Sequence, residues 1–321
     1  MNELQSIGTW WMWVSFGIFV LLMLAVDMFA LGRKGAHKVS AKEALVWSLI
    51  WFSLALLFGG ALWAWLDHTS GSAIADAKTM EYLTGYLLEK TLAMDNIFVF
   101  VMLFSYFAVP IEYQKRVLVY GVLGAIILRA LMILLGAWLI AQFHWVLYLF
   151  GAFLLITGIK MFIFADKEPN LEQNPVLAWL RRHMRITNDY HGDKFWIVEK
   201  GVRWFTPMFL VLVLVELSDV IFAMDSIPAI FAITSDPFIV FTSNIFAILG
   251  LRALYFLLAD MAERFHLLKY GLAVVLMFVG TKMLIVEWFK IPVAVSLGVV
   301  ISILGISVLV SLKSSQKRLS K

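Results

Sequence analysis

The stretch VELSDVIFAMDSIP, residues 215–228, places three carboxylic acids and a proline within an otherwise apolar run. The run extends from residue 206 to residue 234, which is long enough to cross the roughly 30 Å hydrocarbon core of a bilayer. A charged side chain at that depth costs roughly 3 kcal/mol or more. The pattern therefore predicts a membrane-spanning helix whose acids serve a function.

The composition extends this prediction to the whole chain. Of the 321 residues, 62% are hydrophobic and only 15% are charged, with a mean hydropathy of +0.88, whereas soluble domains carry roughly 25% charged residues. Weak period-two alternation argues against a barrel, so helices must satisfy the backbone in the bilayer. We expect an all-α polytopic membrane protein with about nine transmembrane helices. The expected spans are 10–31, 43–66, 80–108, 116–141, 145–165, 206–234, 237–260, 266–289 and 291–312.

Lysine and arginine concentrate in alternate connections between these spans, most densely in residues 32–42 and 166–205. By the positive-inside rule, the N-terminus lies outside and the C-terminus in the cytoplasm. The basic residues indicate topology at a lipid bilayer and not nucleic-acid binding, because no basic stretch is interleaved with base-stacking aromatics. Within the loop 166–205, the pattern predicts a short basic helix at 176–185 and a hairpin at 195–204 around Lys200-Gly201.

The chain contains an internal repeat. LEKTLAMDN at 88–96 matches SDVIFAMDS at 218–226, LRAL at 128–131 matches LRAL at 251–254, and GIKM at 158–161 matches GTKM at 280–283. Each unit contains three expected spans, so the second unit is inverted relative to the first, as in many secondary transporters. The predicted organisation is two N-terminal helices (1–79), a first repeat (80–165), a cytoplasmic loop (166–205), an inverted second repeat (206–290), and a ninth helix with a basic tail (291–321).

Acids outnumber arginines among the ionisable residues expected at membrane depth. Such an excess of buried carboxylates either takes up protons or holds cations. Carboxylate, amide and hydroxyl oxygens suit Mg²⁺, Ca²⁺ or Mn²⁺ and suit Zn²⁺ or Cu⁺ poorly, and the chain has no cysteine. The acids are Glu89, Asp95, Glu216, Asp219 and Asp225, the basic residues are Arg129 and Arg252, and the supporting polar residues are Asn96 and Ser226.

Helical geometry suggests how some of these acids meet. Residues six apart are turned by about 240° on a regular helix, so Asp219 and Asp225 do not share a face. Pro228 cannot donate a hydrogen bond to the Met224 carbonyl. We therefore expect the helix to unwind near Asp225, so that this carboxylate turns toward Asp219 and backbone carbonyls become free for an ion.

Several other interpretations stay open from the residues alone. The acids could pair with Arg129 and Arg252 and simply hold helices together. The protein could be a membrane scaffold that hands metal to exported metalloenzymes, or an exporter of another solute such as an amino acid or a tellurium oxyanion, although the excess of acids counts against an anion. No nucleophile–base pair and no phosphate-binding loop is evident, so neither an enzyme nor direct ATP drive is expected.

Three stretches resemble the TerC family of bacterial membrane proteins. They are GYLLEK at 85–90 followed by Asp95-Asn96, VYGVLG at 119–124, and VELSDVIFAMDSIP at 215–228. The similarity is closest to the Alx-type members and extends over nearly the whole chain. It implies an inner-membrane protein of the LysE-like transporter superfamily and a link to tellurite resistance.

The resemblance also implies the cargo and its ligands. Alx-type members are expected to export manganese, and the family's intramembrane acids match Glu89, Asp95, Glu216, Asp219 and Asp225. The residues by themselves reach only a hard divalent cation. We expect a secondary exporter of Mn²⁺, with proton exchange as the candidate driving force and no permanently bound cofactor, because acids that release metal when protonated couple the two ions.

The predicted topology has a direct test. Reporter fusions should place Ser70 outside the cytoplasm and His183 inside it, because these positions flank an odd number of expected spans. If both positions report the same side, the inverted repeat cannot hold.

Overall fold

The computed structural model describes residues 6–32, 40–143, 145–164, 175–258 and 267–319. Within these ranges the chain forms eleven α-helices and one two-stranded antiparallel sheet. The helices are α1 (Trp10–Gly32), α2 (Ala41–Ser70), α3 (Ser72–Tyr106), α4 (Ile111–Gln142), α5 (Val146–Ile163), α6 (Pro175–His183), α7 (Pro207–Phe231), α8 (Pro237–Leu249), α9 (Leu251–Leu258), α10 (Leu268–Leu284) and α11 (Val293–Leu319), and the strands are β1 (Trp196–Glu199) and β2 (Val202–Phe205).

Local sequence signals set several of these boundaries. Ser40 caps α2 by accepting a hydrogen bond from the Glu43 amide at 3.2 Å, and Asp236 caps α8 by accepting one from Phe238 at 3.0 Å. Gly71 turns the chain sharply between α2 and α3 with a φ of 88°, which a residue with a Cβ rarely adopts. Consequently α2 and α3 are joined by a single residue and pack against each other in antiparallel directions.

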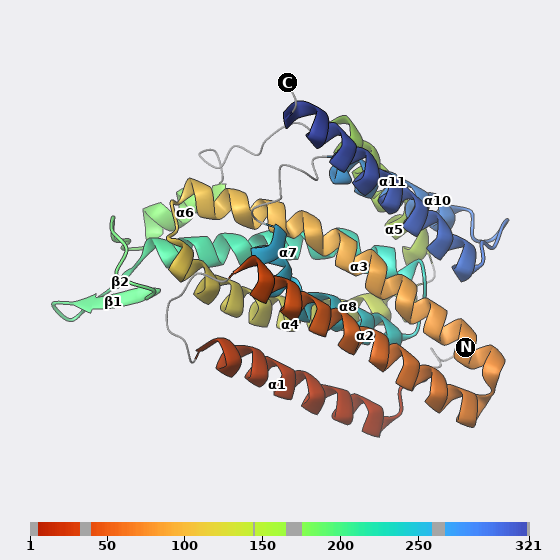
Figure 1. Cartoon of the computed structure of the whole chain (residues 1–321). Coiled ribbons are helices and arrows are strands. Elements are labelled where there is room, and N and C mark those ends of the chain that lie inside the picture. The colour runs from red at the N-terminus through yellow and green to blue at the C-terminus, as the bar shows by residue number, and fades with distance from the viewer. Residues whose placement is uncertain (1–5, 33–39, 144, 165–174, 259–266, 320–321) are drawn as a thin grey trace.

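The helices are arranged in three groups, as Figure 1 shows. Helices α3, α4, α7 and α8 occupy the middle, where α3 packs on α8 and α4 packs on α7. Helices α1 and α2 cover one side, and α5, α10 and α11 lie on the other. In the second group, α10 packs on both α5 and α11. The middle helices therefore contact protein on most sides.

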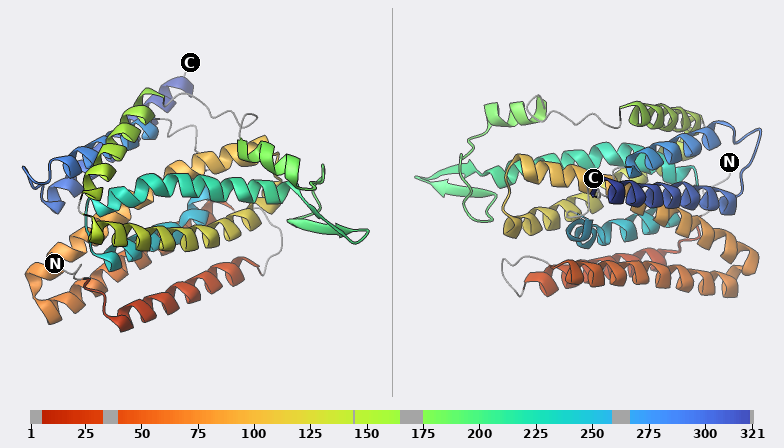
Figure 2. Two further views of the ribbon diagram at one scale, coloured as in Figure 1. Left: turned by 180° about the vertical axis from the view of Figure 1, so that it is seen from behind. Right: turned by 45° about the horizontal axis from the view of Figure 1, so that its top comes forward.

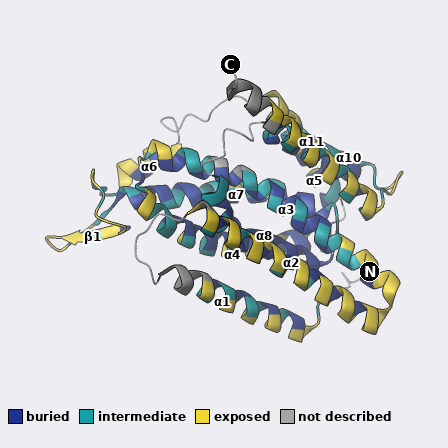
Figure 3. Ribbon diagram, in the orientation of Figure 1, coloured by how far each residue is buried: buried dark blue, intermediate teal, exposed yellow. Residues whose placement is uncertain are grey.

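The outer helices present apolar side chains to the surroundings, as expected for contact with lipid. In Figure 3, α8 is almost entirely buried and α7 is largely buried or half-buried, whereas α1, α2 and α11 carry long exposed stripes. One face of α4 and one face of α5 are exposed as well. Large exposed apolar side chains on these stripes include Leu57, Ile163 and Leu309. A water-soluble protein rarely exposes apolar surface on that scale.

The described helices make this an all-α polytopic membrane protein. Five of them, α2, α4, α5, α7 and α11, are long and apolar enough to cross a bilayer, and the bent pair α8–α9 would make a sixth. Helix α3 is longer than any of these but carries six charged residues, while α10 has 17 residues. Among the described residues, a helix occupies each of the nine expected spans, but length and composition support membrane crossing for five of them, or six with the bent pair. The number nine stays a prediction.

The loop between α5 and α7 follows the sequence prediction where it is described. Helix α6 forms at Pro175–His183, and β1 pairs with β2 so that Glu199 faces Val202. Lys200 and Gly201 both have positive φ angles, the geometry of a two-residue hairpin turn. Helix α6 and the hairpin project from the end of the bundle opposite the described N-terminal segment and the α2–α3 corner (Figure 2).

One prediction about helix continuity was wrong. Helix α7 runs without interruption from Pro207 to Phe231, through Asp225 and Pro228. The break instead lies in the neighbouring expected span, where α8 and α9 meet at Gly250 with a bend of 42°. A proline tolerated inside α7 loses one backbone hydrogen bond, but tight packing keeps residues 226–231 buried and helical.

Helices α5 and α10 make a close crossing through glycines. A Cβ on Gly158 would lie 2.8 Å from the Ala273 carbonyl oxygen, and a Cβ on Gly280 would lie 2.7 Å from the Gly151 carbonyl oxygen. Such small residues let two backbones approach, which is the main source of helix affinity in lipid. The crossing therefore depends on the absence of these side chains.

Replacing Gly280 with alanine should destabilise the protein. The added methyl group meets backbone atoms that cannot turn aside, so we expect a loss of about 1–3 kcal/mol. Gly305→Ala in α11 is the matched control, because a Cβ there meets no atom within 4 Å. Thermal unfolding of the purified proteins in detergent measures the difference, and equal melting temperatures would contradict the crossing.

Candidate functional site

A buried ionic cluster lies where α3, α4 and α7 meet. Glu89, Arg129 and Asp219 occupy the middle of these three helices, and their residues are only 1%, 1% and 2% exposed. Gly121 in α4 contacts Val215, which brings α4 close to α7 near this level. Three charged residues are thus held where water does not reach them.

The Arg129 guanidinium is the centre of this cluster. Its Nη2 lies 3.1 Å from Oδ1 of Asp219 and its Nε lies 3.3 Å from Oδ2, so the pair is bidentate. Its Nη1 forms an ion pair with Glu89 and donates to the Ser226 hydroxyl at 3.3 Å. The Asn96 amide donates to Asp219 Oδ1 at 3.2 Å. A fork of donors that is shared between two carboxylates suits arginine and not lysine.

The charge of the cluster is unbalanced. One guanidinium faces two carboxylates, and Glu216 adds a third acid three residues before Asp219 on the same face of α7. A buried ion pair barely repays the cost of desolvation, and an additional buried anion costs more. With three acids and one guanidinium, the cluster carries a formal net charge of −2 and would be neutralised by one divalent cation.

Glu216 lies directly against α4 at Gly124. A Cβ on Gly124 would overlap the Glu216 carboxyl group, so the glycine makes the space that this acid occupies. Glu216 Oε2 is buried and has no hydrogen-bond partner among the described residues, and the same holds for Asn96 Oδ1. Orphan acceptors beside an anionic cluster are the kind of groups that a cation would complete.

The remaining predicted residues are not gathered at this cluster. Asp225 interacts with Thr157 and lies near Lys160, both in α5, and so occupies a different face of α7 from Asp219. Arg252 is buried in α9 at 3% exposure. Asp95 lies in α3, but its side chain is outside what the structure describes. Within the described residues, no three histidine or acidic side chains are grouped as ligands of one metal ion.

Two contributing residues were missed by the sequence analysis. Gly124 was seen only as part of a motif, and nothing in a single sequence indicates that it faces Glu216. Lys90 was detectable, since it is a charge in the middle of an apolar span. Its Nζ donates to the Ala247 carbonyl at 3.1 Å, beside the break at Gly250, where a cation stabilises the free carbonyls of a helix C-terminus.

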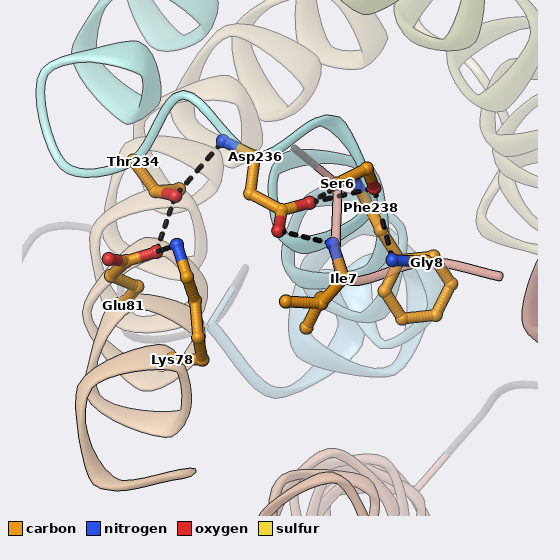
Figure 4. Close-up of polar contacts among 8 residues, drawn as sticks. All are labelled: Ser6, Ile7, Gly8, Lys78, Glu81, Thr234, Asp236 and Phe238. Carbon is orange, nitrogen blue, oxygen red and sulfur yellow. Dashed lines mark hydrogen bonds and ion pairs between the residues drawn. The ribbon is translucent and has the colours of Figure 1, made fainter. Parts of the chain in front are cut away.

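A second polar network closes the end of the bundle that carries the N-terminal segment (Figure 4). Asp236 accepts hydrogen bonds from the Ser6 hydroxyl at 3.0 Å and the Ile7 amide at 2.9 Å. Thr234 donates to Glu81 at 2.5 Å, and Glu81 also pairs with Lys78 at 2.8 Å. These contacts fasten the N-terminal segment and α3 to the turn between α7 and α8.

Comparisons with known proteins give a consistent result. Residues 74–319 match the family described as "Integral membrane protein TerC family". "Putative membrane-bound redox modulator Alx" of Escherichia coli (strain K12) is 56% identical over 308 residues, covering 96% of each chain. The protein of the same name from Salmonella typhi is 54% identical over 308 residues, again covering 96% of each chain. "Uncharacterized membrane protein STKORF319" of Myxococcus xanthus is 49% identical over 316 residues, covering 98% of this chain and 96% of that protein. No solved structure matches the chain.

Replacing Arg129 with leucine should destabilise the protein by about 3–5 kcal/mol, because Glu89 and Asp219 would remain buried without a counter-charge. Arg116→Leu is the control in the same helix. Its ion pair with Asp193 is exposed, so its loss should cost less than about 1 kcal/mol. Denaturant unfolding in detergent gives both values.

A further variant tells whether Arg129→Leu loses stability through its missing charge or through its altered packing. Adding Glu89→Gln and Asp219→Asn to Arg129→Leu removes the stranded charges and should recover part of the stability. If the triple variant is no more stable than Arg129→Leu alone, the arginine acts through its volume and not through its charge.

Proposed function

The chain belongs to the TerC family of integral membrane proteins, and on this premise we propose that it is a secondary transporter exporting Mn²⁺ or a similar hard divalent cation from the cytoplasm. The cation would pass through the carboxylates between α3, α4 and α7 in the inner membrane of a bacterium. The buried, under-neutralised cluster around Arg129 is the observation that carries the proposal.

We further propose nine spans with an outside N-terminus and a cytoplasmic C-terminus. In this arrangement α6 and the hairpin, which lie together at one end of the bundle in Figure 2, are on the cytoplasmic side. The network around Asp236 then lies at the outer end. Thus the cluster around Arg129 would be near the middle of the bilayer, reached from either side by different conformations.

The inverted repeat has support from reciprocal packing. The repeat pairs Gly158 with Gly280, which sets an offset of 122 residues in this part of the chain. Gly158 contacts Ala273 and Met277, and Gly280 contacts Gly151 and Leu155, which are the residues 122 positions before those two. Contacts that exchange partners in this way are the signature of a two-fold axis. The packing of α3 on α8 and of α4 on α7 follows the same rule.

In the proposed cycle, Arg129 is a resident counter-ion that the cation displaces. Glu89 and Asp219 are held by the guanidinium in the described arrangement, and Glu216 contributes the orphan oxygen. An arriving divalent cation would take these oxygens, and Arg129 would return when the cation leaves. The protein would thereby avoid an empty site of bare buried anions, which would be costly in a low-dielectric interior.

Asp225 and Asp95 would form separate binding sites along the path of the ion and would not belong to one coordination site with the Arg129 cluster. Asp225 is turned toward Thr157 and Lys160 of α5, and Asp95 is its repeat mate in α3. Separate carboxylates pass an ion along more readily than a complete cage, because each holds it weakly enough to release it. Protonation of an acid after release would couple export to the proton gradient.

The name of the relatives raises a second candidate, a redox role. Thiol–disulfide exchange by this chain is excluded, because it contains no cysteine. Neither of the other two alternatives, a scaffold that delivers metal and an exporter of another solute, is supported by a specific contact among the described residues. Metal export therefore remains the proposal that uses the largest number of described buried groups.

The proposal predicts that Asp219→Asn and Asp225→Asn abolish manganese tolerance. Loss of one charged ligand is worth at least about 1.5 kcal/mol, so export should slow at least about tenfold. Cells that express either variant should accumulate manganese, measured by elemental analysis, with normal protein levels in the membrane. Asp67→Asn, an exposed aspartate at the end of α2, is the control and should export like the parent.

The outcomes separate the competing interpretations. If both variants keep cellular manganese at the parental level, the cargo or the acids are misassigned. If the variants disappear from the membrane while Asp67→Asn does not, the acids hold the fold together and the transport site lies elsewhere.

A further inference from the structure

A cavity of about 740 Å³ lies at the end of the bundle that carries α6 and the hairpin. Its walls come from the end of α3, from α6 and the segment that follows it, from β2 and from the first residues of α7. It is separate from the cluster around Arg129, because none of the acids of that cluster lines it. No part of the proposed transport cycle uses it.

Two arginines line this cavity, Arg181 and Arg185. Within the described residues, neither makes an ion pair. Other arginines nearby are engaged: Arg116 pairs with Asp193 at 2.6 Å, and Arg203 lies over the Trp196 ring at 5.9 Å. The described segment 175–206 contains six lysine and arginine residues and three acidic residues, so the segment is itself net positive.

The wall that carries the arginines is fixed in place. The Phe205 amide donates to the Arg185 carbonyl at 2.8 Å, and the Thr187 amide donates to the Phe205 carbonyl at 2.8 Å. The Tyr190 hydroxyl donates to the Phe107 carbonyl at 2.7 Å, which ties the segment to the end of α3. Burial raises the pKa of the Tyr190 hydroxyl above its ordinary value, which favours the protonated form that donates this hydrogen bond. The cavity is therefore built before any ligand arrives.

The cavity also has an apolar side and lies where the chain enters the membrane. Phe107, Met184 and Leu210 contribute to its lining, and α7 begins beside it at Pro207. Trp179 on α6 is exposed and stacks on His183, the position expected of a tryptophan at the headgroup level. A ligand that fits must present an anionic group to the arginines and an apolar part to the remaining wall.

We propose that this cavity binds an acidic phospholipid, with its phosphate between Arg181 and Arg185 and its glycerol and upper acyl carbons against the apolar wall. Arginine forks match phosphate geometry, and basic pockets beside membrane helices are known docking places for anionic headgroups. A soluble phosphate would use the arginines but leave the apolar wall without a partner. The bound lipid would join α6, the hairpin and the ends of α3 and α7 into one unit.

The test uses the purified full-length protein in detergent after removal of native lipid. Phosphatidylglycerol, phosphatidylcholine and inorganic phosphate are titrated separately, and the melting temperature is followed. Phosphatidylglycerol should stabilise the parent at lower concentration than either other probe. In Arg181→Gln/Arg185→Gln, its half-saturating concentration should rise at least about tenfold, which corresponds to the loss of one charge-assisted contact.

Matched variants separate the cavity from general surface charge. Arg182→Gln/Lys194→Gln removes the same charge from the same segment but from residues that do not line the cavity, so it should change binding less than about twofold. Asn188→Glu places an acid in the wall and should weaken binding like the arginine pair.

Three results would overturn the proposal. Equal weakening by both double variants would reduce the effect to surface electrostatics. Equal stabilisation by phosphatidylglycerol and phosphatidylcholine would show that no headgroup is recognised. Stabilisation by inorganic phosphate at the same concentration as phosphatidylglycerol would assign the cavity to a soluble phosphate and not to lipid.

Discussion

One guanidinium shared between two buried carboxylates is the interaction on which the middle of this protein depends. Arg129 joins α4 to Glu89 of α3 and Asp219 of α7, and it does so where no water can compensate an unpaired charge. The three helices cannot separate without exposing that charge to lipid. The same ion pairs that hold the helices together leave the site, with Glu216 included, two positive charges short of neutrality. One side chain therefore serves both the fold and the proposed site.

Glycines provide the space that this arrangement requires. Gly124 gives Glu216 room against α4, and Gly280 lets α10 approach α5. In lipid, helices gain little from apolar burial against one another, so close backbone approach and buried polar contacts decide which helices pair. The glycine crossing therefore holds α5 against α10, and the ionic cluster holds α3, α4 and α7 together.

The structure also separates the polar chemistry of the protein into three places. The network around Asp236 fastens one end, the Arg129 cluster occupies the middle, and the arginine-lined cavity lies at the other end. The charges at the two ends can be partly hydrated, whereas those in the middle must satisfy one another. This difference explains why the ends use hydrogen bonds and single ion pairs, and why the middle uses a shared, bidentate contact.

Hydropathy, turn chemistry and the cost of a charge in lipid are local properties of a sequence. They were therefore enough to predict the class of protein, the places of the helices, the hairpin at Lys200-Gly201 and the ionisable residues of the middle helices. The sequence by itself could not determine which acids share an arginine. Unwinding near Pro228 was expected to turn Asp225 toward Asp219, yet α7 stays regular through Pro228, so the two carboxylates face different helices. Likewise, the break at Gly250 lies beside Lys90 and the space at Gly124 is filled by Glu216, and both neighbours are distant in sequence. Only the packing of whole helices determines which faces meet, and that packing is a tertiary property.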